Sequence, residues 1–202
     1  MTDLTYFLLA SITLTLIPGP DFMMVLTLSL TRGSKSAMTF ALGLCSGLIF
    51  HIMGATLGLG LLLKASPALY QWVKTAGLIY LCYLGLKSIA LFAHQRKVEI
   101  QDRSVVRLKR GHLYRQGILM NILNPKVTLF FLSFFPQWIK PTDTILSGPV
   151  FLGLLFIAQA ITIFFLVTLI ASKLKGVFTQ NVRATHLIEG LLYFVIAFAL
   201  SN

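Results

Sequence analysis

The residues of this chain best suited to chemistry are an acid and a base, Asp21 and Lys126, each set inside a long apolar segment. Asp21 ends the run Pro18-Gly19-Pro20-Asp21, and Lys126 ends the run Asn124-Pro125-Lys126. A carboxylate can bind an ammonium group or a proton, and a lysine ammonium can bind a carboxylate. Because an ionisable side chain is costly to keep among apolar residues of a membrane segment, both are functional candidates.

The prolines of these runs should interrupt any helix that contains them. Proline has no backbone N–H, and its ring clashes with the carbonyl four residues earlier. Pro18 should therefore release the carbonyl of Leu14, and Pro125 that of Asn121. In lipid such carbonyls need partners, so both breaks are expected in the protein interior or beside a watery cavity.

Each break also indicates a type of ligand. Asn124 before Pro125 is typical of a helix start, whose free N–H groups would suit a carboxylate together with Lys126. Asp21 and the released carbonyls of its own break would suit an ammonium group. A site with both receptors favours a zwitterion, and hence an amino acid. Two structural alternatives stay open: Asp21 caps its own half-helix, or Lys126 merely neutralises Asp21.

The composition predicts a membrane protein. Of 202 residues, 56% are hydrophobic and 11% are charged, and the mean hydropathy is +0.84; a soluble domain has roughly 25% charged residues. The net charge of +11 does not indicate nucleic-acid binding, because the basic residues fall between apolar segments. No cofactor is expected. The apolar runs predict six transmembrane helices at residues 4–30, 37–63, 69–92, 116–139, 147–172 and 184–201.

The loops divide this single transmembrane domain into halves and indicate its orientation. A basic loop at residues 93–115 separates a first repeat, 1–92, from a second, 116–202. The first, third and fifth loops with their helix ends hold thirteen Lys and Arg, against three on the other side, so both termini should be non-cytoplasmic. The N-terminal stretch lacks a basic start and a cleavage site, so we expect a span and not a cleaved signal.

Asp21 and Lys126 should lie at the same depth. Each is eleven residues from the basic residue at the cytoplasmic end of its span, Arg32 and Arg115 respectively. That spacing corresponds to ~16 Å of helix, near the middle of a ~30 Å hydrocarbon core. The two spans run in opposite directions, so the broken first and fourth helices indicate two inverted three-helix repeats with a binding site between them.

Other polar residues are weaker candidates for the substrate and proton pathway. Gln159 is central in the fifth span and is as well explained by a helix–helix hydrogen bond. His51 could titrate or satisfy a carbonyl, and Asn121 precedes the second break. Glu189 lies six residues from Arg183, where pairing with basic neighbours is the better explanation.

Small residues on the second span predict close helix packing. Gly43 and Gly47 form one GxxxG motif, and Gly54 and Gly58 form another. Such pairs let neighbouring backbones approach each other in a membrane.

Three other functions compete with transport of organic solutes. A thiol–disulfide electron carrier would use Cys45 and Cys82, but these lie away from the two breaks and form no CxxC motif. A metal-ion exporter is disfavoured because the four histidines are scattered. A structural assembly factor has no supporting feature.

Taken together, the motifs resemble the LysE/RhtB family of bacterial amino-acid exporters. The resemblance rests on residues 18–21 followed by Arg32-Gly33, on Tyr80-Leu81-Cys82-Tyr83-Leu84-Gly85, and on residues 124–126 leading to Phe135-Pro136-Gln137. It covers essentially the whole chain. The Asp form of the first motif is more similar to threonine and homoserine exporters, and Glu189 matches no family motif.

The resemblance implies a six-span efflux protein of the bacterial cytoplasmic membrane, built from two inverted repeats. Its expected substrates are amino acids or derivatives such as threonine, homoserine, homoserine lactone or leucine, exchanged for protons by alternating access. We expect Asp21 to alternate between a proton and the substrate ammonium. Membrane lipid and a homo-oligomeric partner are the other expected contacts, and the protein is not expected to be an enzyme.

Overall fold

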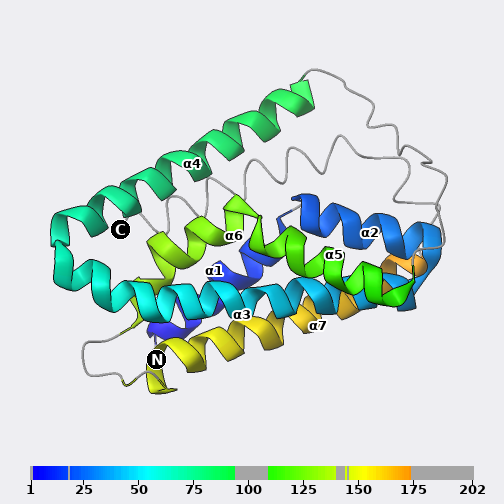
Figure 1. The fold of residues 1–202 in the computed structure, drawn as a ribbon. Helices are drawn as coiled ribbons and strands as arrows, with labels where there is room; N and C mark the ends of the chain where they lie inside the picture. Colours follow the sequence, from blue (N-terminus) through cyan, green and yellow to red (C-terminus); the bar gives the residue numbers. More distant parts are fainter. Residues whose placement is uncertain (1, 18, 94–108, 140–143, 145, 174–202) are drawn as a thin grey trace.

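The computed structural model describes residues 2–17, 19–93, 109–139, 144 and 146–173, and all secondary structure in these ranges is helical. The helices lie roughly along one common axis, with the long helix α3 (Ser34–Ala65) at the centre (Figure 1). Helix α7 (Phe151–Lys173) runs on one side of it. This arrangement, with its long apolar helices, confirms the prediction of an all-α membrane protein.

The first predicted span is broken as expected. Helix α1 (Thr2–Leu16) and helix α2 (Pro20–Arg32) meet at an angle of 57°. Gly33, with φ of 84°, then turns the chain into α3, a backbone conformation that only glycine adopts easily. Helix α4 (Pro67–Ala93) follows α3 and returns along the bundle (Figure 1).

The fourth predicted span is broken too. Helix α5 (Arg110–Ile122) and the segment that starts at Pro125 are bent by 47°. That segment comprises helix α6 (Pro125–Leu129), the π-helix η1 (Phe130–Phe134) and the 3₁₀-helix η2 (Phe135–Trp138). A further π-helical turn, η3 (Leu146–Val150), leads into α7. Irregular helix of this kind often marks functional regions.

Most predicted boundaries are accurate to a few residues, with one clear correction. Helix α5 begins at Arg110 and not at residue 116. The last residues of the predicted basic loop, 110–115, are therefore helical, because the helix extends on its N-terminal side beyond the apolar stretch. Helices Ser34–Leu57 and Gly148–Ala171 are each long and apolar enough to cross a membrane, and the two bent pairs raise the number to four among the described residues.

Two predicted features are not settled by these helices. Helix α4 carries a shorter apolar stretch, Thr75–Lys87, and the sixth span at 184–201 lies outside the described residues. The division into two repeats, the six-span total and the orientation of the termini therefore remain predictions.

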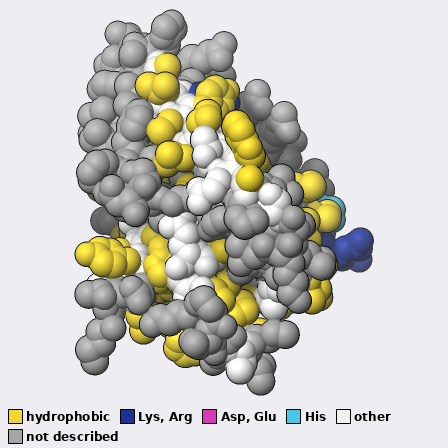
Figure 2. Space-filling model, turned by 90° about the vertical axis from the view of Figure 1, so that its left-hand side faces the viewer, with side chains coloured by type: hydrophobic (Ala, Val, Ile, Leu, Met, Phe, Trp, Pro, Cys, Tyr) yellow, Lys and Arg dark blue, Asp and Glu magenta, His cyan; other side chains and the backbone are white. Residues whose placement is uncertain are grey.

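Large apolar side chains cover much of the outer surface. Phe50, Leu57 and Leu154 are all more than half exposed, far more apolar exposure than a soluble monomer shows. In the view of Figure 2, the described side chains on this face are mostly hydrophobic and form several patches. Such a surface is suited to contact with lipid.

Helices α3 and α5 cross at very short range because glycines face each other. A Cβ added to Gly43 would meet the backbone carbonyl of Tyr114, and one added to Gly117 would meet that of Phe40. A Cβ on Gly47 would lie 2.7 Å from Asn121 Cβ. The first GxxxG motif is thus a packing motif, as predicted.

The second GxxxG motif behaves differently. No described atom lies within 4 Å of a Cβ added to Gly54. Gly54 therefore makes no close helix contact among the described residues, contrary to the prediction for this glycine, and the surroundings of Gly58 lie outside the described part of the chain.

An aromatic cluster packs around the π-helix η1. Phe130, Phe131 and Phe156 have ring centroids 5.3–5.7 Å apart, and Phe7 meets Trp138 edge to face at 5.3 Å. All of these phenylalanines are buried. The cluster ties α1 and α7 to the segment that follows the second break.

The α3–α5 crossing can be tested by adding one methyl group. Gly117→Ala should lower stability by about 1–3 kcal/mol, because the new Cβ would meet rigid backbone. Gly54→Ala is the matched control and should be neutral or slightly stabilising, since alanine favours helix. Thermal unfolding of the purified proteins in detergent measures both. Equal stability of the two variants would contradict the close crossing.

Candidate functional site

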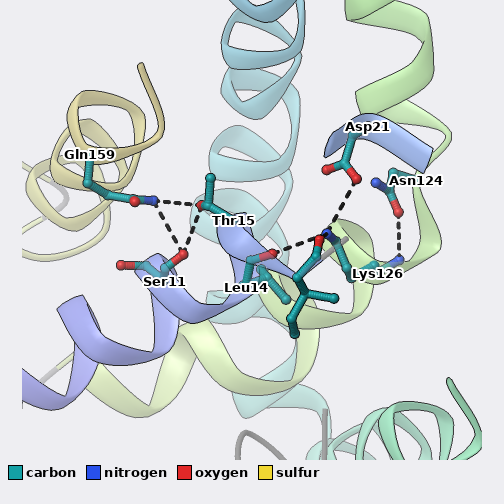
Figure 3. Close-up of polar contacts among 8 residues, drawn as sticks. Ser11, Leu14, Thr15, Asp21, Asn124, Lys126 and Gln159 are labelled. Atoms are coloured by element: carbon teal, nitrogen blue, oxygen red, sulfur yellow. Dashed lines mark hydrogen bonds and ion pairs between the residues drawn. The ribbon is translucent and has the colours of Figure 1, made fainter. Parts of the chain in front are cut away.

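Asp21 and Lys126 meet in the interior of the bundle. Lys126 Nζ lies 3.4 Å from Asp21 Oδ1, and the two residues are 3% and 5% exposed respectively. They come from different breaks, 105 positions apart in the chain, and face each other in Figure 3. The two side chains are therefore in contact, as a common depth in the membrane would require, and the depth itself stays a prediction.

The acid and the base occupy equivalent positions in their half-helices. Helix α2 has Gly19 as N-cap and Pro20 at its first position, so Asp21 is the second helical residue. Helix α6 has Asn124 as N-cap and Pro125 at its first position, so Lys126 is also second. A helix N-terminus favours the negative charge of Asp21 and disfavours the positive charge of Lys126. The Lys126 ammonium extends to the other break, where it finds acceptors.

Those acceptors are mainly carbonyls released by the first break. Lys126 Nζ donates to Leu14 O at 3.1 Å and to Ile17 O at 3.4 Å. Leu14 is the residue whose carbonyl Pro18 was predicted to release. The ammonium thus has three oxygen acceptors, one of them charged, which offset part of the large cost of burying it.

Gly19 leaves the space that the pair needs. A Cβ at this position would lie 2.9 Å from Asp21 Oδ1 and 3.2 Å from Lys126 Nζ. Its backbone is extended, and its carbonyl accepts from Met23 N at 2.9 Å to begin α2. Gly19, and not Asp21, is therefore the N-cap residue of this half-helix, and Asp21 lies in its first turn.

The second break confirms the prediction for Asn124. Its Oδ1 accepts from the backbone N–H of Lys126 at 3.0 Å, with Pro125 at the first helical position. Its Nδ2 is buried and has no hydrogen-bond partner among the described residues. The amide thus leaves one donor unused close to the ion pair (Figure 3).

His51 and Asn121 are joined across the same break. His51 Nε2 lies 3.0 Å from Asn121 O, the carbonyl that Pro125 was predicted to release. The His51 ring also stacks on Phe131, with centroids 5.8 Å apart. His51 therefore satisfies a carbonyl, as one of its two interpretations held. Asn121 Oδ1 is buried and lacks a partner within the described chain.

Gln159 links α7 to α1. Its Nε2 donates to Thr15 Oγ1 at 3.0 Å and to Ser11 O at 3.4 Å (Figure 3). The helix–helix hydrogen bond expected as its structural role is thus present. Its Oε1 is a third buried amide atom without a partner among the described residues.

A small cavity adjoins the ion pair. Its volume is about 20 Å³, space for roughly one water molecule. One part of the wall is polar, formed by Thr15, Asp21, Asn121 and Lys126. The remainder is apolar: Leu14, Leu44, Cys45, Leu48, Val127, Phe156, Ala160 and Phe164.

Sequence reasoning missed this apolar wall. Leu44 and Leu48 are four residues apart, as are Phe156, Ala160 and Phe164, so each set shares one helix face. That spacing was visible, but many apolar faces of a membrane helix look alike. Two predicted site residues, Pro18 and Glu189, lie outside the described residues.

The structure changes the expected role of Lys126. The sequence predicted separate receptors for an ammonium and a carboxylate, but here the Lys126 ammonium itself occupies the ammonium receptor. The predicted structural pair between Asp21 and Lys126 is therefore present, and the cavity of about 20 Å³ beside it is too small for an amino acid.

The coupling within the pair can be measured with a double-mutant cycle. Asp21→Asn or Lys126→Met alone should cost about 3–5 kcal/mol, because each leaves a buried charge unpaired. The double variant should recover much of this loss, although the carbonyl of Leu14 would still lack its donor; Ile17 O would keep the Gly19 N–H, which donates to it at 2.7 Å. Unfolding in detergent provides the measurement, and strictly additive losses would show that the pair does not interact.

Comparison with known proteins agrees with this geometry. The model of the LysE type translocator family matches residues 12–201. The homoserine/homoserine lactone efflux protein of Salmonella typhimurium is 30% identical over 201 residues, covering 97% of this chain and 94% of the relative. The leucine efflux protein of Salmonella choleraesuis is 33% identical over 136 residues, covering 67% and 63% respectively.

A membrane protein of Bacillus subtilis of unassigned function is 32% identical over 154 residues, which cover 73% of this chain and 70% of the relative. No solved structure matches the chain significantly. The family match over most of the chain, with a charged pair buried between two broken helices, leads to one conclusion. This chain belongs to the LysE type translocator family and is a membrane transporter, not an enzyme.

Proposed function

We propose that this protein exports amino acids or close derivatives across the bacterial cytoplasmic membrane, by proton-coupled alternating access. The observation that carries the proposal is the buried Asp21–Lys126 pair between two helix breaks. Relatives named for homoserine, homoserine lactone and leucine efflux support the substrate class. The breaks supply released backbone groups and opposite charges, which are what a zwitterion requires.

Substrate binding would exchange one ion pair for two. The α-ammonium of the substrate would take the place of the Lys126 ammonium on Asp21, Leu14 O and Ile17 O. The displaced Lys126 would then pair with the substrate carboxylate. No charge is left unpaired at any stage, which keeps the energetic cost of opening the pair low.

The cavity wall supports a neutral side chain. Beside the ion pair lie Leu44, Leu48, Phe156 and Phe164, all apolar and buried. A charged substrate side chain would find no partner against these residues, whereas an aliphatic one would gain from burial. Asn121 Oδ1, on the polar part of the wall, would suit a side-chain hydroxyl.

Asp21 would couple export to protons. Its carboxylate can bind the substrate ammonium or a proton, and these two partners exclude each other. A proton arriving from the acidic outer side would favour substrate release there. The small volume of the cavity, about 20 Å³, supports a substrate-free conformation, and the aromatic contact of Phe131 with Phe156 packs beside it.

Transport can be tested by counterflow in proteoliposomes with a panel of labelled amino acids, with and without a pH gradient. The unmodified protein should accumulate one or a few neutral amino acids. Asp21→Asn should lose the response to the pH gradient, and Lys126→Met should lose most flux, because each variant lacks one of the two charges.

Gly54→Ala is the matched control and should transport normally. Two results would count against the proposal. One is the absence of flux for every neutral amino acid and lactone in folded protein. The other, against the coupling role alone, is full pH-driven export by Asp21→Asn.

The apolar wall makes a separate prediction about selectivity. Ala160 is buried in the cavity wall, so Ala160→Leu would fill space that the substrate side chain needs. Transport of branched or long side chains should fall about tenfold or more relative to small ones, a difference of ~1.4 kcal/mol. Ratios of kcat/KM across a side-chain series measure this. An equal loss of transport for all substrates would show that the substrate side chain does not bind beside Ala160.

A further inference from the structure

We propose that Lys126 acts as a tethered competitor for its own transport site: its ammonium occupies a receptor that is built for any primary alkylammonium. This inference rests on the proposed function, because it treats the Lys126 position as the substrate ammonium position. It adds that the receptor is a separable binding site, defined by the chemistry of an –NH₃⁺ group on an alkyl chain.

The receptor matches the donor count of a primary ammonium. An –NH₃⁺ group has three N–H donors and no acceptor. Lys126 Nζ has three oxygen acceptors, at 3.1 Å from Leu14 O, 3.4 Å from Ile17 O and 3.4 Å from Asp21 Oδ1. The α-ammonium of an amino acid carries the same three donors. A quaternary ammonium would carry the charge without any donor.

The three oxygens of the receptor all come from the first break, and none belongs to the segment that carries Lys126. Leu14 O is free because residue 18 is proline and has no N–H to donate. Gly19 leaves the space that the ammonium occupies, because a Cβ added at this position would meet both charged groups. The Lys126 stem arrives from a different segment of the chain, α6.

A built-in ammonium has a consequence for transport. While Lys126 occupies the receptor, the empty site holds a neutral pair and needs no ion from solution. A substrate must displace this tethered group, so a ligand that can also engage the released Lys126 with a carboxylate has the advantage. Simple alkylamines lack that carboxylate and should bind the unmodified protein poorly.

Removing the tether tests the inference. Lys126→Ala deletes three carbons and the ammonium, which is the size of n-propylammonium. Propylammonium should raise the unfolding temperature of Lys126→Ala saturably in detergent, with an apparent affinity at least about tenfold tighter than for the unmodified protein. Lys126→Met keeps the stem and loses only the ammonium, so NH₄⁺ should stabilise that variant by the same mechanism.

Two controls separate a specific receptor from general cation binding. Tetramethylammonium, which has no N–H donor, should leave Lys126→Ala unchanged. The Lys126→Ala/Asp21→Asn double variant should lose the response to propylammonium, because the charged acceptor is gone. If only one of the two Lys126 variants folds, the response of that variant to its own amine, propylammonium for Lys126→Ala or NH₄⁺ for Lys126→Met, is the test of the inference.

Each outcome has a distinct meaning. Stabilisation by propylammonium or NH₄⁺ that requires Asp21 supports the tethered competitor. Equal responses to propylammonium and tetramethylammonium, or no response in folded variants, would overturn it. Because this assay measures binding of amines without transport, its failure is distinguishable from a failure of amino-acid counterflow.

Discussion

The structure depends on one constraint: a carboxylate and an ammonium are kept inside a protein whose surroundings offer almost no other polar groups. Neither Asp21 nor Lys126 could be buried alone, because an unpaired charge there would cost several kcal/mol. The pair in turn needs oxygen acceptors, and only a broken helix can supply backbone carbonyls in a membrane. The first break and the ion pair therefore stabilise each other. The break supplies carbonyl acceptors to the Lys126 ammonium, and the ammonium supplies hydrogen-bond donors to those carbonyls.

The packing around the pair follows from this requirement. Gly43, Gly47 and Gly117 bring α3 and α5 so close that the second break is held against α3. The aromatic cluster holds the segment after that break to α1 and α7. The backbone is irregular at the two breaks and regular at these glycine contacts, so the breaks are where we propose that the site opens.

The polar groups left over have a common location. Asn121, Asn124 and Gln159 each keep one buried amide atom without a partner in the described part of the chain, although unsatisfied buried groups are rare in proteins. Asn121 and Asn124 lie at the second break, and Gln159 of α7 is hydrogen-bonded to Thr15, near the end of α1 before the first break. Among the described residues, the charges of the ion pair are thus balanced, whereas three nearby amide atoms lack hydrogen-bond partners.

Some features were determined by the sequence alone. Proline chemistry identified both breaks and the carbonyls of Leu14 and Asn121 that lose their regular helical partners, and residue counts predicted one depth for Asp21 and Lys126, because helix geometry is local and regular. Tertiary structure alone decided the rest. That the Lys126 ammonium occupies the acceptors expected for a ligand, that His51 caps the Asn121 carbonyl, and that Ala160 and Phe164 face the cavity all depend on how helices rotate against one another. The sequence of a helix that is apolar on all sides does not indicate which face is turned toward the protein interior.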